Sequence, residues 1–202
     1  MKLDLDKYRR ALHPANIFEI LPRPIIEQMV RGFFYHLKKG VTLLWAKYDA
    51  AQSRSVVQDD RLDPFDYSNP KDREFYNRVC WECRCTSGDS ECYKCDKRAA
   101  QQYVDAIRTE VKPYPCWLGM DDLAYPLRIE DRVYAVLFGG QIIPDDPERV
   151  AGIEATIRKE VGSTNPALAG RLVELLYEEQ KVQWDSDLLC LDPHAAVRIM
   201  RL

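Results

Sequence analysis

The side chains best suited to chemistry are concentrated in residues 80–116, a stretch that contains six of the chain's seven cysteines. Cys80 and Cys83 form one C-x-x-C pair, and Cys92 and Cys95 form a second. Cys85 follows the first pair, and Cys116 lies 21 residues after the second. In a C-x-x-C pair the two intervening residues let both sulfurs reach one ion. Two such pairs around a short polar turn are typical of four thiolates on a zinc ion or an iron–sulfur cluster.

Other interpretations of these cysteines stay open. Paired thiols can oxidise without any metal, which would give a redox sensor that reshapes the turn between Cys80 and Cys95. Single cysteines are also common as small buried hydrophobic residues, and this is our interpretation of Cys190 among its leucines. A disulfide framework is disfavoured because the cysteine count is odd and the N-terminus lacks the apolar segment of a secretory leader.

The composition favours one cytoplasmic domain over residues 1–202. Of the 202 residues 46% are hydrophobic, which is enough for a single well-filled core. The 29 basic and 32 acidic residues are scattered and give a formal net charge of -3, so no strong field would draw the chain onto nucleic acid. The longest apolar run, residues 133–143, is too short to cross a membrane. We therefore expect no direct nucleic-acid or membrane contact, and a homodimer is a possible assembly.

Helical and strand patterns alternate along the chain. A helical pattern starts at residue 25 and ends at Gly40, residues 41–46 are predicted to be a buried strand, and a second strand begins near Val56. Residues 123–129 and 132–143 are predicted to be two strands joined by a tight turn. The second of these is apolar on both faces, which predicts a central strand that ends at Gly139-Gly140 in a close backbone approach or a bulge.

Predicted helices bring the cysteines together. A helix that starts at Asn69-Pro70 would carry Cys80 near its C-terminal end. An amphipathic helix over residues 96–111 follows Cys95, and two prolines then turn the chain so that Cys116 returns toward the other sulfurs. Three further helices begin at Asp146-Pro147, Asn165-Pro166 and Asp192-Pro193, so residues 147–202 are predicted to be a helical packing or signalling region.

Few other side chains suggest chemistry. Gln141 ends an apolar strand and either binds a ligand or satisfies buried backbone groups. Asp121 and Asp122 are adjacent, and we expect such carboxylates to face water. There is no Gly-rich phosphate loop, nucleophile elbow or His-Glu-x-x-His signature, and the three histidines (His13, His36 and His194) are scattered. We therefore expect no enzyme, with an iron–sulfur or zinc enzyme as a less favoured alternative.

An ordered set of features in residues 79–143 resembles the PocR-type sensory domain, a PAS-like ligand-binding module of bacterial and archaeal signalling proteins. The features are Val79-Cys80, Cys92-x-x-Cys95-Asp96, Cys116-x-x-Gly119, Pro126, Glu130 and Gly140-Gln141. The resemblance implies an α+β fold, a PAS-like antiparallel sheet flanked by helices, with additional N- and C-terminal helices. The PocR-like core would cover residues 25–160.

The resemblance also implies a function. Such a domain binds a small organic molecule between its sheet and helices and signals to a partner protein or output module. Known output modules include DNA-binding helix-turn-helix pairs, which regulate transcription, as well as histidine kinases and cyclic-dinucleotide enzymes. Nothing after Ile143 in this chain resembles any of these. The expected mechanism is a population shift, in which the ligand binds one arrangement of the flanking helices better than another.

The resemblance and the bare spacing favour different metal ligands. Carried over position by position, the family pattern gives Cys80, Cys92, Cys95 and Cys116, whereas spacing alone favours Cys83 in place of Cys116. We adopt the family set, because the two prolines before Cys116 return it to the others, and treat Cys83 and Cys85 as spare ligands. Zinc and an iron–sulfur cluster are both compatible with these thiols. Residues proposed for the wall of the organic-ligand pocket are Trp117, Tyr125 and Gln141.

Overall fold

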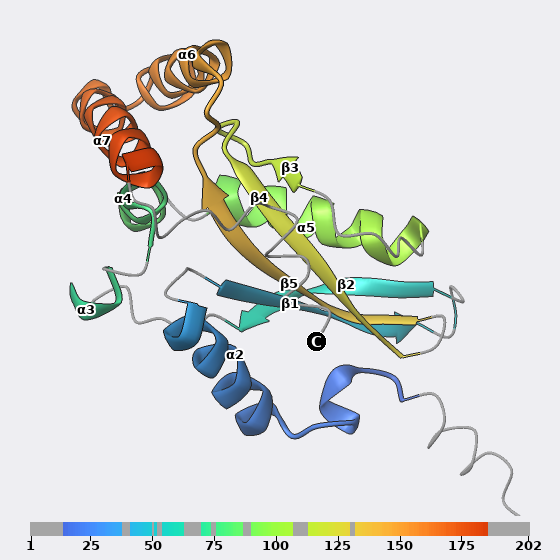
Figure 1. The fold of residues 1–202 in the computed structure, drawn as a ribbon. Coiled ribbons are helices and arrows are strands. Elements are labelled where there is room, and N and C mark those ends of the chain that lie inside the picture. The colour runs from blue at the N-terminus through green and yellow to red at the C-terminus, as the bar shows by residue number, and fades with distance from the viewer. Residues whose placement is uncertain are drawn as a thin grey trace, which may run out of the picture.

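A computed structural model describes residues 14–37, 41–49, 51, 54–62, 70–73, 76–86, 90–106, 113–129 and 132–185. In this part of the chain one antiparallel sheet has the strand order β2-β1-β5-β4-β3 (Figure 1). The strands are β1 (Val41–Asp49), β2 (Arg54–Leu62), β3 (Pro113–Pro115), β4 (Asp121–Ile129) and β5 (Arg132–Ile142). The doubly apolar β5 pairs with both β1 and β4, so its predicted central position is confirmed.

Helices surround this sheet, and the predicted α+β class is confirmed. The helical elements are η1 (Ile17–Glu19), α2 (Arg23–Leu37), α3 (Pro70–Arg73), α4 (Arg78–Thr86), α5 (Ser90–Ala106), α6 (Pro147–Thr156), η2 (Ile157–Val161) and α7 (Pro166–Asp185). In Figure 1, η1 and α2 lie below the sheet, and α5 runs along its other side. The pair α6 and α7 lies at the end of the sheet where β5 finishes.

Two apolar clusters fix helices to the sheet. On one face, α5 packs through Ala99, Ala100 and Tyr103 against sheet residues that include Val136 and Phe138. On the other face, η1 and α2 pack against β1 and β5 through buried apolar residues, among them Ile17, Ile26, Val30, Leu43 and Tyr134. Burial of these side chains is the main term that holds the layers together, at about 25 cal/mol per Å² of apolar surface.

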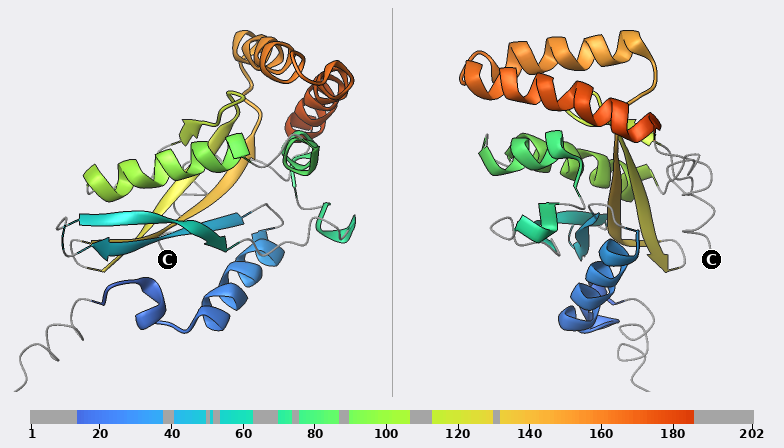
Figure 2. Two further views of the ribbon diagram at one scale, coloured as in Figure 1. Left: turned by 180° about the vertical axis from the view of Figure 1, so that it is seen from behind. Right: turned by 60° about the vertical axis from the view of Figure 1, so that its left-hand side comes forward.

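A third apolar cluster joins α4 to the C-terminal helices. Leu172, Leu175 and Leu176 of α7 are fully buried and belong to one cluster with Val79 and Cys83 of α4. The same cluster includes Leu118, Met120 and residues of α6. Figure 2 shows α4 directly beside α7, with α6 on the far side of α7. The second half of the predicted C-terminal helical region, including Cys190 and the helix from Asp192, lies outside the described residues.

Two predicted helix boundaries differ from the structure. The helix expected from Asn69-Pro70 through Cys80 is divided into α3 and α4. The cause is Asn77, whose Oδ1 accepts the backbone N–H groups of Val79 at 3.0 Å and Cys80 at 3.4 Å and so caps a new helix. Cys80 therefore lies in the first turn of α4. In the same way α5 begins at Ser90 rather than near Asp96, so Cys92 and Cys95 both lie within its first turns.

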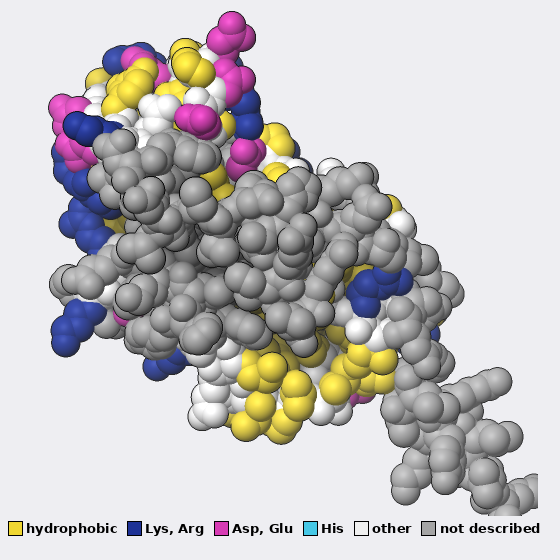
Figure 3. Space-filling model, viewed as in Figure 1, with side chains coloured by type: hydrophobic (Ala, Val, Ile, Leu, Met, Phe, Trp, Pro, Cys, Tyr) yellow, Lys and Arg dark blue, Asp and Glu magenta, His cyan; other side chains and the backbone are white. Residues whose placement is uncertain are grey.

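The surface of the described residues mixes charge and apolar groups. No helix in the described ranges is long and apolar enough to cross a bilayer. Figure 3 shows acidic and basic side chains interspersed over α6 and α7. Apolar side chains gather instead along η1 and α2 at the lower edge of that view, where the exposed ones are Ile20, Leu21, Ile25 and Met29.

Candidate functional site: a cavity lined by cysteines

A small cavity lies where α4, the start of α5, the turn at residues 116–120 and the ends of β4 and β5 meet. Its volume is about 20 Å³, which is room for about one or two water molecules or a single ion. The wall is formed by Cys80, Cys83, Arg84, Cys92, Asp96, Cys116, Trp117, Leu118, Met120, Asp121, Asp122 and Gln141. Thiols, carboxyl groups and one guanidinium thus face a space of atomic dimensions.

The cavity gathers most of the predicted site residues. Of the four predicted metal ligands, Cys80, Cys92 and Cys116 are in the wall and Cys95 is not. Cys95 is nevertheless close, because its sulfur accepts the backbone N–H of Trp117 and interacts with Cys92. The spacing-only alternative Cys83 is in the wall and almost fully buried. Cys85, the other spare ligand, is exposed.

The three residues predicted to form the wall of an organic-ligand pocket do not all lie together in the structure. Trp117 and Gln141 line the cavity. Tyr125 lies opposite Leu137 in the β4–β5 ladder and does not line the cavity. The two residues that do line it come from different elements, the Cys116 turn and the end of β5, so the sheet end brings them together.

The turn that carries Cys116 is built to present a sulfur. The Cys116 N–H donates to the carbonyl of Met120 at 2.7 Å, and the Gly119 N–H donates to the carbonyl of Cys116 at 2.9 Å. Gly119 has φ +96°, a left-handed conformation that favours glycine. In this turn the Cys116 sulfur accepts the backbone N–H groups of Leu118 and Met120. Such amide donors stabilise a thiolate, as they do around sulfur-bound metals.

Cys92 stands out among the thiols. Its sulfur accepts the indole N–H of Trp117 at 3.1 Å and makes a hydrogen bond with the thiol of Cys83. The hydrogen bond from Cys83 is the largest cause that lowers the pKa of Cys92 to about 7, with Arg84 and Trp117 acting in the same direction. Burial opposes this shift. Among Cys80, Cys92, Cys95 and Cys116, Cys92 is therefore the thiol that ionises most readily.

Burial has the opposite effect on the neighbouring thiols. Desolvation raises the pKa of Cys116 to about 12 and raises the pKa values of Cys80 and Cys95 above their ordinary range. In the absence of a cation these three thiols stay protonated at neutral pH. Among the described side chains, no group of three or more Cys, His, Asp or Glu is arranged to hold a metal ion.

Two buried carboxyl groups lie next to the thiols. Asp96 accepts a hydrogen bond from Arg84 Nη2 at 3.2 Å and another from the hydroxyl of Tyr114 at 3.1 Å. Asp122 is also buried, and one of its oxygens accepts the backbone N–H of Leu123 at 2.9 Å. Burial, followed by repulsion from Asp96, raises the pKa of Asp122 to about 8. The expectation that Asp121 and Asp122 both face water is wrong for Asp122, because it points toward the cavity.

The burial of Asp122 predicts a pH dependence. Its folded pKa lies above the unfolded value, so Asp122 binds a proton more tightly in the folded state and stability falls as pH rises from about 4 to about 8. In this window Asp122 accounts for up to about 1.4 kcal/mol of lost stability per pH unit. Asp122→Asn, which cannot ionise, should be stabilised relative to the parent by an amount that grows across the window and then stays constant.

Urea unfolding of the parent and Asp122→Asn at several pH values measures this difference. Asp121→Asn is the matched control, because Asp121 forms a partly exposed ion pair with Arg149 at 2.6 Å. A stability difference between parent and Asp122→Asn that does not change with pH would contradict the raised pKa.

Gly140 and Gln141 form a bulge that connects the cavity to α4. Asp121 pairs with Ile142 and Leu123 with Gly139, so two residues of β5 lie opposite the single residue Asp122. The bulge confirms the irregularity predicted at the end of this strand. Gln141 has φ +53°, unusual for a residue with a side chain, and its Oε1 accepts the backbone N–H of Asn77 at 3.3 Å.

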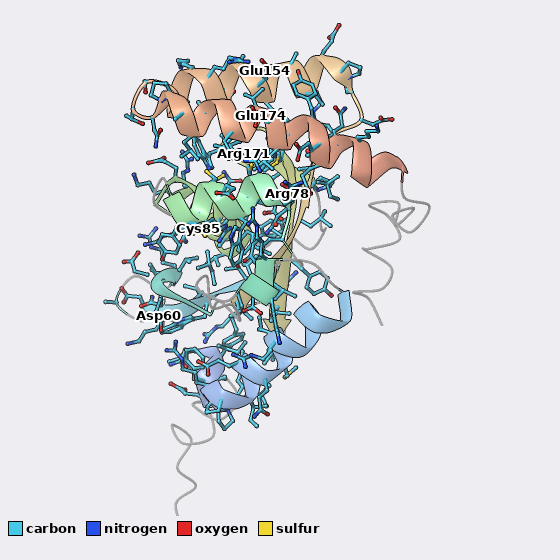
Figure 4. The ribbon with its side chains drawn as sticks, turned by 90° about the vertical axis from the view of Figure 1, so that its left-hand side faces the viewer. Asp60, Arg78, Cys85, Glu154, Arg171 and Glu174 are labelled. Carbon is cyan, nitrogen blue, oxygen red and sulfur yellow. The ribbon has the colours of Figure 1, made fainter. Side chains whose placement is uncertain are left out.

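Asn77 in turn caps α4, which carries two of the wall cysteines. Arg78, the next residue, forms ion pairs with Glu178 at 2.9 Å and Glu179 at 3.7 Å on α7. Figure 4 shows Arg78 at the end of α4 opposite to Cys85, with α7 stacked on the helix. The cavity, α4 and α7 therefore form one connected set of contacts.

Sequence reasoning missed several residues of this site. Arg84, Asn77 and Tyr114 gave no signal, because single polar residues in helical or loop patterns are usually exposed.

A family model described as "Sensory domain found in PocR" matches residues 48–174, which cover more than half of the chain and the whole cavity wall. No curated protein and no solved structure matches the chain.

Proposed function

Because the chain belongs to the PocR sensory-domain family, we propose that it senses a small molecule through or beside the cavity lined by cysteines and signals to a partner protein or output module. The family supports small-molecule sensing and signalling rather than catalysis. The observation that carries the choice of site is the convergence of Cys80, Cys92, Cys116, Trp117 and Gln141 on one cavity. The proposed setting is the cytoplasm, where these thiols stay reduced.

The finer part of the proposal is a metal held by Cys80, Cys92, Cys95 and Cys116. Three of these cysteines share the cavity wall, and the sulfurs of Cys92, Cys95 and Cys116 each accept an N–H group. These donors fit thiolate ligands, although no three Cys, His, Asp or Glu side chains of the described residues are arranged to hold a metal, so the sulfurs would have to move closer together to coordinate an ion. When bound, the ion would neutralise the buried thiolates and tie α4, α5 and the Cys116 turn together. The cavity volume of about 20 Å³ favours a single zinc ion over an iron–sulfur cluster.

The proposed signal passes from the cavity to α7 through α4. Cys83 and Val79 of α4 pack in the same core as Leu172 and Leu175 of α7. A ligand that changes the position of α4 must therefore change how α4 packs on α7. Such a ligand shifts the population of helix arrangements by as much as its affinities for the two arrangements differ.

Metal analysis of anaerobically purified protein tests the proposed metal site. We expect about one zinc per chain in the parent. Cys116→Ser should lose most of the metal, because it removes the sulfur around which the turn is built. Cobalt substitution should give charge-transfer bands whose intensity reports the number of thiolate ligands.

Cys85→Ser is the matched control, because Cys85 belongs to the same stretch but is exposed. It should keep the full metal content. Folded parent protein that contains neither zinc nor iron would refute the metal part and leave the sensing part in place. Full metal content in Cys116→Ser would refute the assignment of Cys116.

A further inference from the structure

We propose that Cys92 and Cys83 form a peroxide-sensitive dithiol that closes into a disulfide between α5 and α4. The inference adds a regulatory chemistry to the proposed sensing function and rests on it only in that both use the same cavity. It concerns the metal-free state of the site.

The geometry singles out this pair of thiols. The thiol of Cys83 makes a side-chain hydrogen bond with the sulfur of Cys92. The two residues come from the neighbouring helices α4 and α5, and both line the same cavity. The indole N–H of Trp117 also donates to Cys92 Sγ, which orients one lone pair and leaves the sulfur facing the cavity.

The cavity admits an oxidant of the right size. Its volume of about 20 Å³ suits hydrogen peroxide, a molecule only slightly larger than water. Cys92 is partly exposed, whereas Cys83 is only 1% exposed. Peroxide therefore reaches Cys92 first, and Cys83 is the buried resolving thiol.

The chemistry needs no further reactant. The Cys92 thiolate attacks one peroxide oxygen, so that an S–O bond forms, the O–O bond breaks, and the leaving hydroxide takes up the proton that the Cys92 thiol released and becomes water. Sulfur is oxidised to sulfenic acid by two electrons as the peroxide is reduced. The sulfur of Cys83 then attacks Cys92, the S–S bond forms, the S–O bond breaks, and the hydroxyl group leaves with the Cys83 proton as water. One peroxide thus converts two thiols into one disulfide and two water molecules.

Closure of the disulfide changes the core beneath α7. Cys83 belongs to the apolar cluster that joins α4 to Leu172, Leu175 and Leu176. A covalent bond to α5 fixes Cys83 on the cavity side and removes Cys92 from the proposed set of metal ligands. Oxidation at the cavity is in this way coupled to the packing of the C-terminal helices.

Peptide mapping of oxidised, metal-free full-length protein tests the proposal. The protein is stripped with a chelator under reductant, desalted anaerobically and treated with one equivalent of hydrogen peroxide. Titration of the denatured protein should then find five thiols in place of seven. Trypsin cuts after Arg78, Arg84 and Lys94, so the expected product joins peptide 79–84 to peptide 85–94.

Variants identify the two sulfurs. In a Cys85→Ser background, peptide 85–94 retains Cys92 alone, and the cross-link should persist. Adding Cys80→Ser should leave it in place, whereas adding Cys83→Ser should abolish it. Cys83→Ala provides a second, apolar replacement in the core, and far-UV circular dichroism verifies that each variant is folded.

The outcomes separate this inference from the proposed metal site. A cross-link that survives Cys83 replacement, or parent protein that keeps seven thiols, would overturn the dithiol without affecting zinc content. Zinc-loaded protein should lose its thiols at least tenfold more slowly than metal-free protein. Equal rates, in protein that demonstrably binds zinc, would show that Cys92 is not a metal ligand and would leave the dithiol intact.

Discussion

Asp96→Ala should lower the free energy of unfolding by about 3–5 kcal/mol, the usual cost of removing one partner of a buried ion pair. The side chains of Arg84 and Asp96 are only 6% and 4% exposed, and Nη2 of Arg84 lies 3.2 Å from Oδ2 of Asp96. Without this carboxylate the guanidinium stays buried with much less compensation. Tyr114 also loses the acceptor for its hydroxyl.

Chemical denaturation of the parent and the variant, at equal pH and salt, measures this loss. Asp121→Ala is the matched control, because its ion pair with Arg149 is partly exposed and should contribute at most about 1 kcal/mol. The double variant Arg84→Met/Asp96→Leu should recover much of the stability, since an apolar pair of similar volume replaces a buried ion pair at little cost. Equal losses for Asp96→Ala and Asp121→Ala would mean that the buried pair is not structurally important.

Gly140→Ala should have the next largest effect, a loss of about 1–3 kcal/mol together with altered cavity chemistry. At φ +150° a side chain is strained whatever the available space. A Cβ here would also lie 3.1 Å from Oδ1 of Asp122 and 3.1 Å from the backbone nitrogen of Leu123. The second of these atoms belongs to the paired strand β4 and cannot move aside as a side chain can.

Thermal and urea unfolding measure the stability loss, and metal content measures the effect on the cavity. Gly152→Ala is the control of opposite sign. It lies in α6 with no atom within 4 Å of an added Cβ, so alanine should stabilise the helix by up to about 1 kcal/mol. If Gly140→Ala and Gly152→Ala were equally stable, the close approach at the bulge would impose no constraint.

Local pattern was enough to predict much of the fold. The alternation of apolar residues placed β4 and β5, and the apolar character of both faces of β5 put this strand in the centre of the sheet. Asp146-Pro147 and Asn165-Pro166 correctly marked the starts of α6 and α7. Such signals are readable because periodicity and helix capping involve residues within a few positions of one another.

The helix boundaries near the cavity could not be predicted from local sequence in this way. The division between α3 and α4 depends on Asn77, whose side chain caps α4 while its backbone N–H is held by Gln141, 64 residues later in the chain. A sequence shows the capping residue but not the distant acceptor that fixes it. The burial of Asp122 has the same origin, since the bulge in β5 sets its direction.

The sequence by itself determined which chemistry is available: a dense set of thiols on helices that flank a sheet. Only the tertiary structure decided which thiols meet. Cys92 and Cys95 are three residues apart on α5, so their side chains differ by about 60° around the helix axis. The rotation of α5 is set by Ala99, Ala100 and Tyr103 against the sheet, and it directs Cys92 into the cavity and Cys95 beside it. Because packing between distant parts of the chain sets that rotation, the spacing of the cysteines along the sequence cannot predict it.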